Sequence, residues 1–505
     1  MLTITNKYSD YKVNAEKAPE PIDPSACVEE YHTDVLIAGA GIGGVCAALR
    51  AAELGLQVIV TEKTSSWSAR GAHIGAINSR LAKECGKTID EEKLIRKWIR
   101  ATGNRADEQM IRFFVYNSGK AMDWLLDKMD EAGISYGLWD GYYKGPTYTE
   151  YPGTHLFDGE VAAVVRAMYR MAVEKGVRFL FNCPCVQLIQ EGGRVSGAVA
   201  EGKEGYVTIH AGKGVILATG DIGGSEELCR KYAPEALATT GPLYNPPGAN
   251  TGDGHLMGSW AGGVMQDAPF PTTLHPQYLS RLQYFYLFVG PDGKRFMNED
   301  TWVQSRSLAA MRQDGGYAFS VFDSKWPEEV EKSLPAGGGL FWDNGRRRLG
   351  EKWTPDGDKK LIDSYIKNGS GFTAQTIEEL AHKMNVPFET FRKTVDRYND
   401  LVRSGKDTDF GKRPELLTSI TEPPFYAMKF AAATLCIVGG LLTDLKYHVL
   451  RANGDIVKGL YAIGNVSGGL YASDYPLLIP GSTHGRALLS GCTAAEDCAA
   501  ADSCG

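Results

Sequence analysis

Two tyrosines precede a turn rich in proline and glycine near the end of the chain, in the stretch YASDYPLLIPGSTHGRA at residues 471–487. Proline restricts the backbone, so a turn of this composition holds its neighbouring side chains in place. A phenol has an ordinary pKa of about 10 and can donate a hydrogen bond or release a proton. Tyr475 therefore has the chemistry of an acid or a hydrogen-bond donor to a bound molecule. The alternative is a buried tyrosine that braces the loop.

A glycine-rich turn near the start of the chain has the spacing of a phosphate-binding motif. The segment 34–62 has the pattern of a buried strand, the turn GAGIGG, an alanine-rich helix and a second strand that ends at Glu62. Gly39 permits the tight turn, Gly41 lets the backbone approach a pyrophosphate, and Gly44 lets the helix pack on the sheet. The N–H groups at the helix N-terminus face the phosphates, and Glu62 is placed to accept from a ribose hydroxyl. This segment predicts a dinucleotide site.

Length and charge narrow the class of protein. A chain of 505 residues is too long for one simple core, so two or more domains are expected. The formal net charge of −7 argues against nucleic acid or an anionic membrane as the main partner. No uninterrupted apolar run approaches membrane-spanning length, and the first residues are polar and acidic, unlike an export signal. We expect a cytoplasmic protein without a membrane span; the alternative is an export signal that the sequence does not contain.

The ten cysteines do not have the pattern of a disulfide scaffold in a chain of this length. Cys183 and Cys185 are too close together for the usual zinc spacing. Cys492, Cys498 and Cys504 recur every six residues, which scatters them around a helix axis. We predict free thiols in a reducing compartment and no metal site. The alternative is an iron–sulfur cluster on the three tail cysteines.

Residue patterns change along the chain and indicate its domains. Helical patterns cover 91–132 and 158–175, and short alternating runs over 177–216 predict a β-meander. The stretch after residue 257 mixes aromatic residues, loops and two helical patterns, and the glycine-rich strand pattern returns after residue 416. An inserted domain in a split nucleotide-binding domain fits this order. The predicted parts are an N-terminal extension over 1–30, the split domain over 31–256 and 416–505, and the inserted domain over 257–415.

Nearly the whole chain after residue 30 resembles the FAD-dependent fumarate reductase and 3-ketosteroid dehydrogenase flavoproteins. The resemblance rests on the GAGIGG turn with Glu62 and on further segments. These are VILATG at 215–220, TGDGH at 251–255, GKRFMNE at 293–299, the segment 398–411 and GLYAIGN at 459–465. The resemblance implies an α/β fold: a Rossmann-like FAD-binding domain with a parallel sheet and a β-meander, interrupted by an α+β capping domain that contributes to the substrate site.

The resemblance also implies which residues bind FAD, with Asp253 and Asn465 on the flavin side. Trp67 stands where succinate dehydrogenases have the histidine that is joined covalently to flavin, so we expect non-covalent FAD. The predicted cofactor-binding residues are Gly39, Gly41, Ile42, Gly43, Gly44, Glu62, Lys63, Ser68, Gly71, Ala72, Val186, Thr219, Gly220, Asp253, Asn465 and Ser482.

The substrate positions depart from the fumarate reductase pattern. Val303 stands where those enzymes place a proton-donating arginine, and Arg306 is displaced from that position by three residues. Cys436 and Leu478 stand at the positions of a family histidine and a family arginine, whereas His275 is retained. A pocket without these cations does not compensate two buried carboxylates, so we expect fumarate to be a poor substrate.

The ketosteroid dehydrogenase pattern fits the turn after Tyr475 better. Those enzymes place a tyrosine and a proline before a glycine at a helix start, and the tyrosine O–H and glycine N–H polarise a ketone. Tyr475 and Gly481 repeat the pattern with a two-residue insertion. The resemblance implies that both groups serve a carbonyl as negative charge develops on it, while hydride passes between flavin N5 and the β-carbon of an enone or enoate, with steroid-like or aryl substrates favoured. The other candidate catalytic residues are Tyr471, His275, Arg306, His484 and Arg486.

The electron source is expected to lie outside the chain. No haem-attachment motif and no FMN-attachment domain is recognisable, so a separate donor protein or a soluble reduced carrier is predicted. Two other functions stay open: a fumarate-reductase-like dicarboxylate reductase, and a flavin-binding electron-transfer or assembly subunit without its own substrate chemistry. A closed pocket over the flavin favours an enzyme, whereas an open flavin edge beside a large apolar patch favours a subunit.

Overall fold

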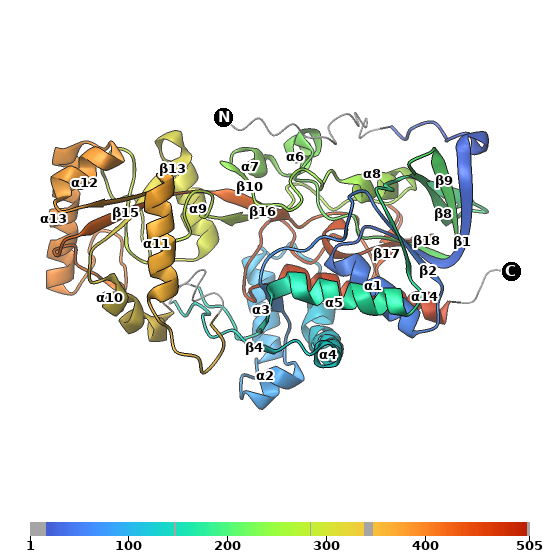
Figure 1. The fold of residues 1–505 in the computed structure, drawn as a ribbon, viewed down its shortest axis with the longest axis horizontal. Helices are drawn as coiled ribbons and strands as arrows, with labels where there is room; N and C mark the ends of the chain where they lie inside the picture. The colour runs from blue at the N-terminus through green and yellow to red at the C-terminus, as the bar shows by residue number, and fades with distance from the viewer. Residues whose placement is uncertain (1–16, 146–147, 283, 338–346, 502–505) are drawn as a thin grey trace.

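A computed structural model describes residues 17–145, 148–282, 284–337 and 347–501. The molecule is elongated, with an eight-stranded sheet and its helices at one end and a smaller four-stranded sheet with α10 to α13 at the other (Figure 1). The fold is mixed α/β, as the sequence predicts. A short three-stranded sheet lies between the two ends.

The large sheet combines strands from both ends of the chain in the order β17-β18-β9-β1-β2-β6. β18, β9, β1, β2 and β6 are parallel, whereas β7 and β8 extend β9 as an antiparallel meander. This arrangement confirms the predicted parallel sheet and meander. The strands are β1 (Cys27–Ala38), β2 (Val58–Glu62), β6 (Arg178–Phe181), β7 (Cys185–Glu191), β8 (Arg194–Glu201), β9 (Tyr206–Leu217), β17 (His448–Leu450) and β18 (Ile456–Ala462).

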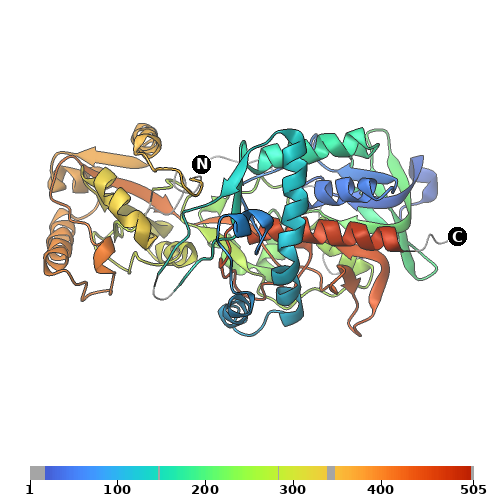
Figure 2. The same ribbon diagram turned by 90° about the horizontal axis from the view of Figure 1, so that it is seen from below.

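Two helices pack on the large sheet, α1 (Ile42–Glu53) and α14 (Ser482–Ala500). α5 (Glu160–Glu174) packs on α1, and α4 (Glu108–Ala132) packs on α14. In Figure 2 the red helix α14 crosses the cyan helix α4. Small residues let α14 approach α1 closely, since a Cβ on Gly491 would lie 2.9 Å from the carbonyl oxygen of Gly43. The N-cap Asp107 and the left-handed C-cap Gly133 fix the ends of α4.

The smaller end of the molecule is an antiparallel sheet in the order β12-β13-β15-β14. Its strands are β12 (Leu287–Val289), β13 (Tyr317–Phe322), β14 (Gly371–Ala374) and β15 (Phe425–Ala431). β15 pairs with β13 along its whole length, so this sheet reaches beyond the predicted boundary at residue 415. A pattern of alternating strand residues does not show which sheet a strand joins.

The other helices and strands lie around the smaller sheet or between the two ends of the molecule. The remaining helices are α2 (Arg80–Glu84), α3 (Glu91–Ala101), α6 (Glu226–Tyr232), α7 (Pro234–Leu237), α8 (Asp253–Trp260), α9 (Val303–Met311), α10 (Trp326–Ser333), α11 (Asp356–Asn368), α12 (Ile377–Met384) and α13 (Phe388–Ser404). The remaining strands are β3 (His73–Gly75), β4 (Tyr136–Leu138) and β5 (Thr154–Phe157) in one sheet, and β10 (Gly241–Pro242), β16 (Ala433–Ile437) and β11 (Thr272–His275) in another.

A buried ion network explains two of the segments that carried the resemblance. Arg295 of the GKRFMNE segment lies 2.7 Å from Glu299 and 2.8 Å from Asp407, and all three side chains are buried. Lys412 completes the network at 3.4 Å from Glu299. A buried carboxylate that lost its cation would be strongly destabilising. These residues therefore hold the smaller sheet to α13 and have a structural role.

Candidate functional site

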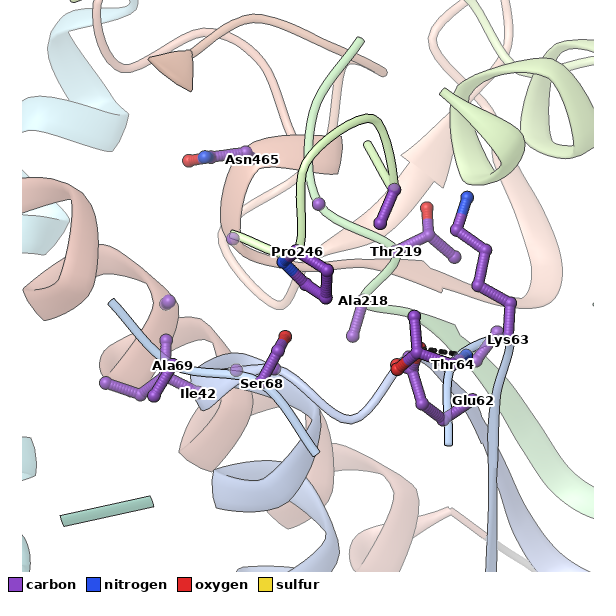
Figure 3. Close-up of a pocket in the computed structure, with 18 of the residues that line it drawn as sticks. Ile42, Glu62, Lys63, Thr64, Ser68, Ala69, Ala218, Thr219, Pro246 and Asn465 are labelled. Atoms are coloured by element: carbon purple, nitrogen blue, oxygen red, sulfur yellow. Dashed lines mark hydrogen bonds between the residues drawn. The ribbon is translucent and has the colours of Figure 1, made fainter. Parts of the chain in front are cut away.

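A pocket opens where the parallel strands β1, β2 and β9 end and α1 begins (Figure 3). We call it the strand-end pocket. Ligands of open parallel sheets bind at this edge, because loops and helix N-termini converge there. Its wall also includes residues from the last third of the chain, among them Asn465, Thr483 and His484. Segments far apart in the sequence thus form one site.

The three motif glycines have distinct structural roles. A Cβ on Gly39, whose φ is +108°, would lie 2.4 Å from the carbonyl oxygen of Ala218, and a Cβ on Gly44 would lie 1.9 Å from that of Gly39. Both positions exclude a side chain, because the turn packs against β9 and against itself. A Cβ on Gly41 would meet no atom within 4 Å. Gly41 lines the strand-end pocket, so its missing side chain leaves room for a bound group.

Polar side chains at the end of β2 are fixed by hydrogen bonds. Glu62 accepts from the backbone N–H of Ala40 and of Thr64, at 2.8 Å each. Lys63 donates to Thr251 at 2.7 Å and to Asp253 at 2.8 Å. Glu62, Lys63 and Thr64 lie together at one end of the pocket, and Asn465 lies apart from them (Figure 3).

Most of the predicted cofactor-binding residues line this pocket. They are Gly39, Gly41, Ile42, Gly43, Glu62, Lys63, Ser68, Thr219, Gly220, Asp253 and Asn465. The pocket lining does not include Gly44, Gly71, Ala72, Val186 or Ser482. Cys185 takes the place of Val186, because neighbouring residues of β7 point to opposite faces of the sheet.

Sequence reasoning missed a second group of pocket residues, which includes Arg70, Tyr244 and Pro246. The Arg70 guanidinium carbon lies 4.3 Å from the centre of the Tyr244 ring, and the guanidinium lies 3.8 Å from Asp221. Arg70 also donates to the carbonyl of Leu435, next to Cys436. Arg70 follows Trp67 by three residues, in a stretch that no motif marks, and no motif marks the loop that carries Tyr244.

Both tyrosines of the C-terminal turn bond to one serine. The hydroxyl of Ser482 lies 3.0 Å from the phenol oxygens of Tyr471 and Tyr475, and the two ring centres are 5.0 Å apart. We call these three residues the tyrosine cluster; all are buried. Ser482 is the first residue of α14, so its neighbours Thr483 and His484 face the strand-end pocket while Ser482 faces the tyrosines.

The loop around the cluster has an unusual backbone. Ala472 and Leu477 have φ values of 53° and 45°, which residues with a Cβ rarely adopt. Gly481 has a φ of +80°, and a Cβ there would lie 2.6 Å from the carbonyl oxygen of His73. Strained backbone persists where surrounding packing holds it, often at functional sites. The predicted stiffness of this turn agrees with these features.

Both phenols keep their protons near neutral pH. Burial raises the pKa of Tyr475 well above that of an ordinary phenol. Burial also raises the pKa of Tyr471 to about 12, against the effect of the nearby Arg486 charge. Both side chains are therefore hydrogen-bond or proton donors.

Arg486 lies behind the tyrosine cluster. Its guanidinium donates to the carbonyl of Ser467 at 3.2 Å and to the side-chain oxygen of Asn465 at 3.1 Å. The guanidinium carbon is 5.1 Å from the centre of the Tyr471 ring. Arg486 therefore links the cluster to Asn465 in the pocket wall.

The two candidate histidines are neutral. Burial lowers the pKa of His275 to about 3, and its ring bonds Gln277 at 2.7 Å. Burial likewise lowers the pKa of His484 to about 4, and its Nδ1 lies 2.8 Å from the carbonyl oxygen of His73. Because a carbonyl only accepts, His484 carries its proton on Nδ1. Neither histidine holds a second proton near neutral pH.

Arg306 lies on α9, buried and close to the carboxylates of Glu150, Glu299 and Asp300. Burial raises the pKa of Glu150 to about 8. α9 also contacts the turn that carries Tyr475, since Gln304 donates to Asp474 at 2.7 Å. The structure thus places Arg306 among acidic side chains outside the strand-end pocket lining.

The cysteines that the structure describes are free thiols, and most of them are buried. Cys492 and Cys498 are buried in α14, with Cys492 3.6 Å from Cys46 of α1, and Cys504 lies outside the described residues. Among the residues that the structure describes, no group of histidine, cysteine and acidic side chains could hold a metal ion. Within the same residues no helix is long and apolar enough to cross a membrane.

The strand, glycine turn, helix and terminal acid around this pocket define a dinucleotide-binding protein. The chain belongs to the FAD-binding domain family, whose model matches residues 34–477. A fumarate reductase (cytochrome) of Shewanella frigidimarina is 27% identical over 461 residues, covering 87% of this chain and 73% of that protein. A vinyl phenol reductase of Lactiplantibacillus plantarum is 27% identical over 486 residues, covering 91% of this chain and 94% of that protein. A 3-oxosteroid 1-dehydrogenase of Mycolicibacterium smegmatis is 26% identical over 590 residues, covering 94% of this chain and 98% of that protein.

Solved structures share the fold. The open conformation of a flavocytochrome c3 fumarate reductase superposes with a TM-score of 0.72 at 24% identity, covering 98% of this chain and 84% of that one. A 3-ketosteroid-Δ4-(5α)-dehydrogenase of Rhodococcus jostii superposes with a TM-score of 0.71 at 24% identity, covering 95% and 99%.

Proposed function

We propose that the protein is an FAD-dependent oxidoreductase that adds or removes hydrogen across a carbon–carbon double bond conjugated to a carbonyl. The observation that carries this proposal is the buried tyrosine cluster at the start of α14, whose next residues line the strand-end pocket. A protonated phenol there is suited to polarise or protonate a carbonyl compound. Relatives named for fumarate, vinyl phenol and 3-oxosteroids support the same class of reaction.

The strand-end pocket fits FAD by its donor set. The glycine turn and the N-terminus of α1 would hold the pyrophosphate, and Glu62 would accept from the ribose. Asp253 and Asn465 would contact the flavin half of FAD. Trp67 has no imidazole for the histidyl link, so the FAD is non-covalent. When bound, the flavin supplies or accepts the hydride. A separate protein or a soluble carrier provides the electrons.

The chain's own residues orient and protonate the substrate. Tyr475 donates its O–H to the carbonyl, with the N–H of Gly481 as second donor. Tyr471, His484 and Arg486 shape the surroundings of Tyr475. The smaller sheet with α9 to α13 acts as the cap over the substrate and closes it from water.

The alternative of a dicarboxylate reductase is less well supported. Val303, Cys436 and Leu478 are buried. Val303 and Leu478 carry no charge, and burial raises the pKa of the Cys436 thiol, so Cys436 is also neutral near neutral pH. Arg70 brings one cation close to Cys436, which the sequence did not predict, but Asp221 already lies beside it. Arg486 is a second buried cation near Cys436, but its guanidinium already donates to Ser467 and to Asn465. We infer that these two arginines do not compensate two buried carboxylates. Relatives named as reductases and dehydrogenases argue against an electron-transfer or assembly subunit without its own substrate chemistry.

A panel of electron acceptors tests the substrate class. The reduced holoenzyme should be reoxidised by aryl-substituted enones or enoates at least about tenfold faster than by fumarate, because two carboxylates would be desolvated without enough compensating cations. Anaerobic stopped-flow measurement of the flavin absorbance gives the rates, with the saturated analogue of each acceptor as control. Fumarate as the fastest acceptor would show that a dicarboxylate site exists.

A further inference from the structure

The Ser482 hydroxyl is the link between the two phenols of the tyrosine cluster. It accepts from the Tyr471 O–H at 3.0 Å and lies 3.0 Å from the Tyr475 oxygen. The exposed fractions of Tyr471, Tyr475 and Ser482 are 0%, 3% and 1%, so the three oxygens are sealed from bulk water.

The number of protons on the Ser482 hydroxyl determines which way the hydrogen bonds of the tyrosine cluster point. A serine hydroxyl has one proton and two acceptor positions. Because Ser482 accepts from Tyr471, its own proton is available to the oxygen of Tyr475. The proton of Tyr475 is then free to point toward a bound substrate. The hydrogen bonds run from Tyr471 through Ser482 to Tyr475, and bonds in such a chain polarise one another.

We propose that Ser482 is a positioning residue that passes a proton from Tyr471 to Tyr475 while Tyr475 protonates the substrate. This inference rests on the proposed function. As the hydride adds to the β-carbon, the Tyr475 O–H bond breaks and its proton joins the substrate. The Ser482 proton moves to the Tyr475 oxygen, and the Tyr471 proton moves to the Ser482 oxygen. The electron pair stays on the Tyr471 oxygen, beside the Arg486 guanidinium, until water that enters after product release returns one proton.

The position of Arg486 supports this direction of transfer. Its guanidinium carbon lies 5.1 Å from the Tyr471 ring centre, and its charge lowers the pKa of Tyr471 against the effect of burial. The negative charge left by the transfer therefore ends beside a buried cation. Burial also opposes a charge on Tyr475.

A proton inventory on the holoenzyme tests the proposed proton transfer from Tyr471 through Ser482 to Tyr475, which we call the relay. Reduced enzyme with its FAD is mixed anaerobically with an aryl-substituted enone in mixtures of H₂O and D₂O. Ser482→Ala should slow reoxidation about tenfold, and Ser482→Thr should restore it, since threonine returns the hydroxyl. The wild-type rate should depend non-linearly on the deuterium fraction, because several protons move together. The dependence should become linear in Ser482→Ala and Tyr471→Phe. Thr493→Ala, which removes another hydroxyl from α14, is the control.

The possible results separate the relay from the proposed function. Wild-type rates and an unchanged isotope dependence in Ser482→Ala and Tyr471→Phe would overturn the relay and leave the proposed function intact. Failure of every conjugated acceptor to reoxidise the wild-type enzyme would overturn the proposed function, and the relay with it. If Ser482→Ala does not retain FAD, Tyr471→Phe decides, because it keeps the buried ring and removes only the first proton.

Discussion

Gly41→Asp is expected to give a folded protein without FAD. Gly41 has a φ of −78° and a ψ of −176°, an extended conformation that any residue adopts, and it is the N-cap of α1. Aspartate is a favoured N-cap, so the helix itself should tolerate the change. The new carboxylate would, however, point into the strand-end pocket, where a Cβ meets no atom within 4 Å. It would place a side chain and a negative charge against the pyrophosphate.

The ratio of flavin to protein after purification measures this effect, with circular dichroism to check the fold. Wild-type protein should release its flavin as free FAD on denaturation. Gly212→Asp adds the same charge at an exposed position of β9, outside the pocket, and should keep its FAD. A yellow Gly41→Asp protein with the wild-type flavin content would place the FAD elsewhere.

Tyr475→Phe is expected to lower the rate of substrate reduction at least about a hundredfold while FAD binding stays normal. Phenylalanine keeps the ring that packs 5.0 Å from Tyr471 and removes only the hydroxyl. A group that only braces the loop would leave the rate nearly unchanged, whereas loss of an acid or an oxyanion donor costs on the order of 10²-fold or more. Tyr471→Phe should be milder, since Tyr475 remains to donate.

Stopped-flow reoxidation of the reduced enzyme isolates this step from reduction by the electron donor. Tyr461→Phe is a matched control, because the Tyr461 hydroxyl bonds Asp497 on the far part of α14. A wild-type rate in Tyr475→Phe would assign the tyrosine a structural role. His275 and His484 could not then replace it as acids near neutral pH, because each is neutral there.

Several residues at the strand-end pocket could be predicted from the sequence because their positions are set by a local motif. Gly39, Gly41 and Glu62 lie within one strand–turn–helix–strand unit, and their spacing fixes their positions in space. The predicted parallel sheet follows from the same unit. The position of Asp253 came through the resemblance, and the structure adds its contact with Lys63 at 2.8 Å.

The substrate side depends on contacts between distant segments, which local patterns do not determine. Arg70 approaches Cys436 across more than three hundred residues of chain, through a donated bond to Leu435. Cys185 lines the strand-end pocket and the predicted Val186 does not, since neighbouring residues of a strand point to opposite faces. Ser482, which the resemblance predicts to bind the cofactor, bonds the two tyrosines in the structure. Its neighbours face the pocket instead.

Product analysis after a single turnover tests the central claim most directly. Holoenzyme reduced anaerobically is mixed with one equivalent of an aryl-substituted enone, and the products are analysed by mass spectrometry once the flavin absorbance has returned. We predict one saturated carbonyl compound for each flavin reoxidised, because hydride and proton both go to the double bond. Reoxidation of the flavin without a saturated product, or no reoxidation at all, would contradict an enzyme that acts on conjugated double bonds.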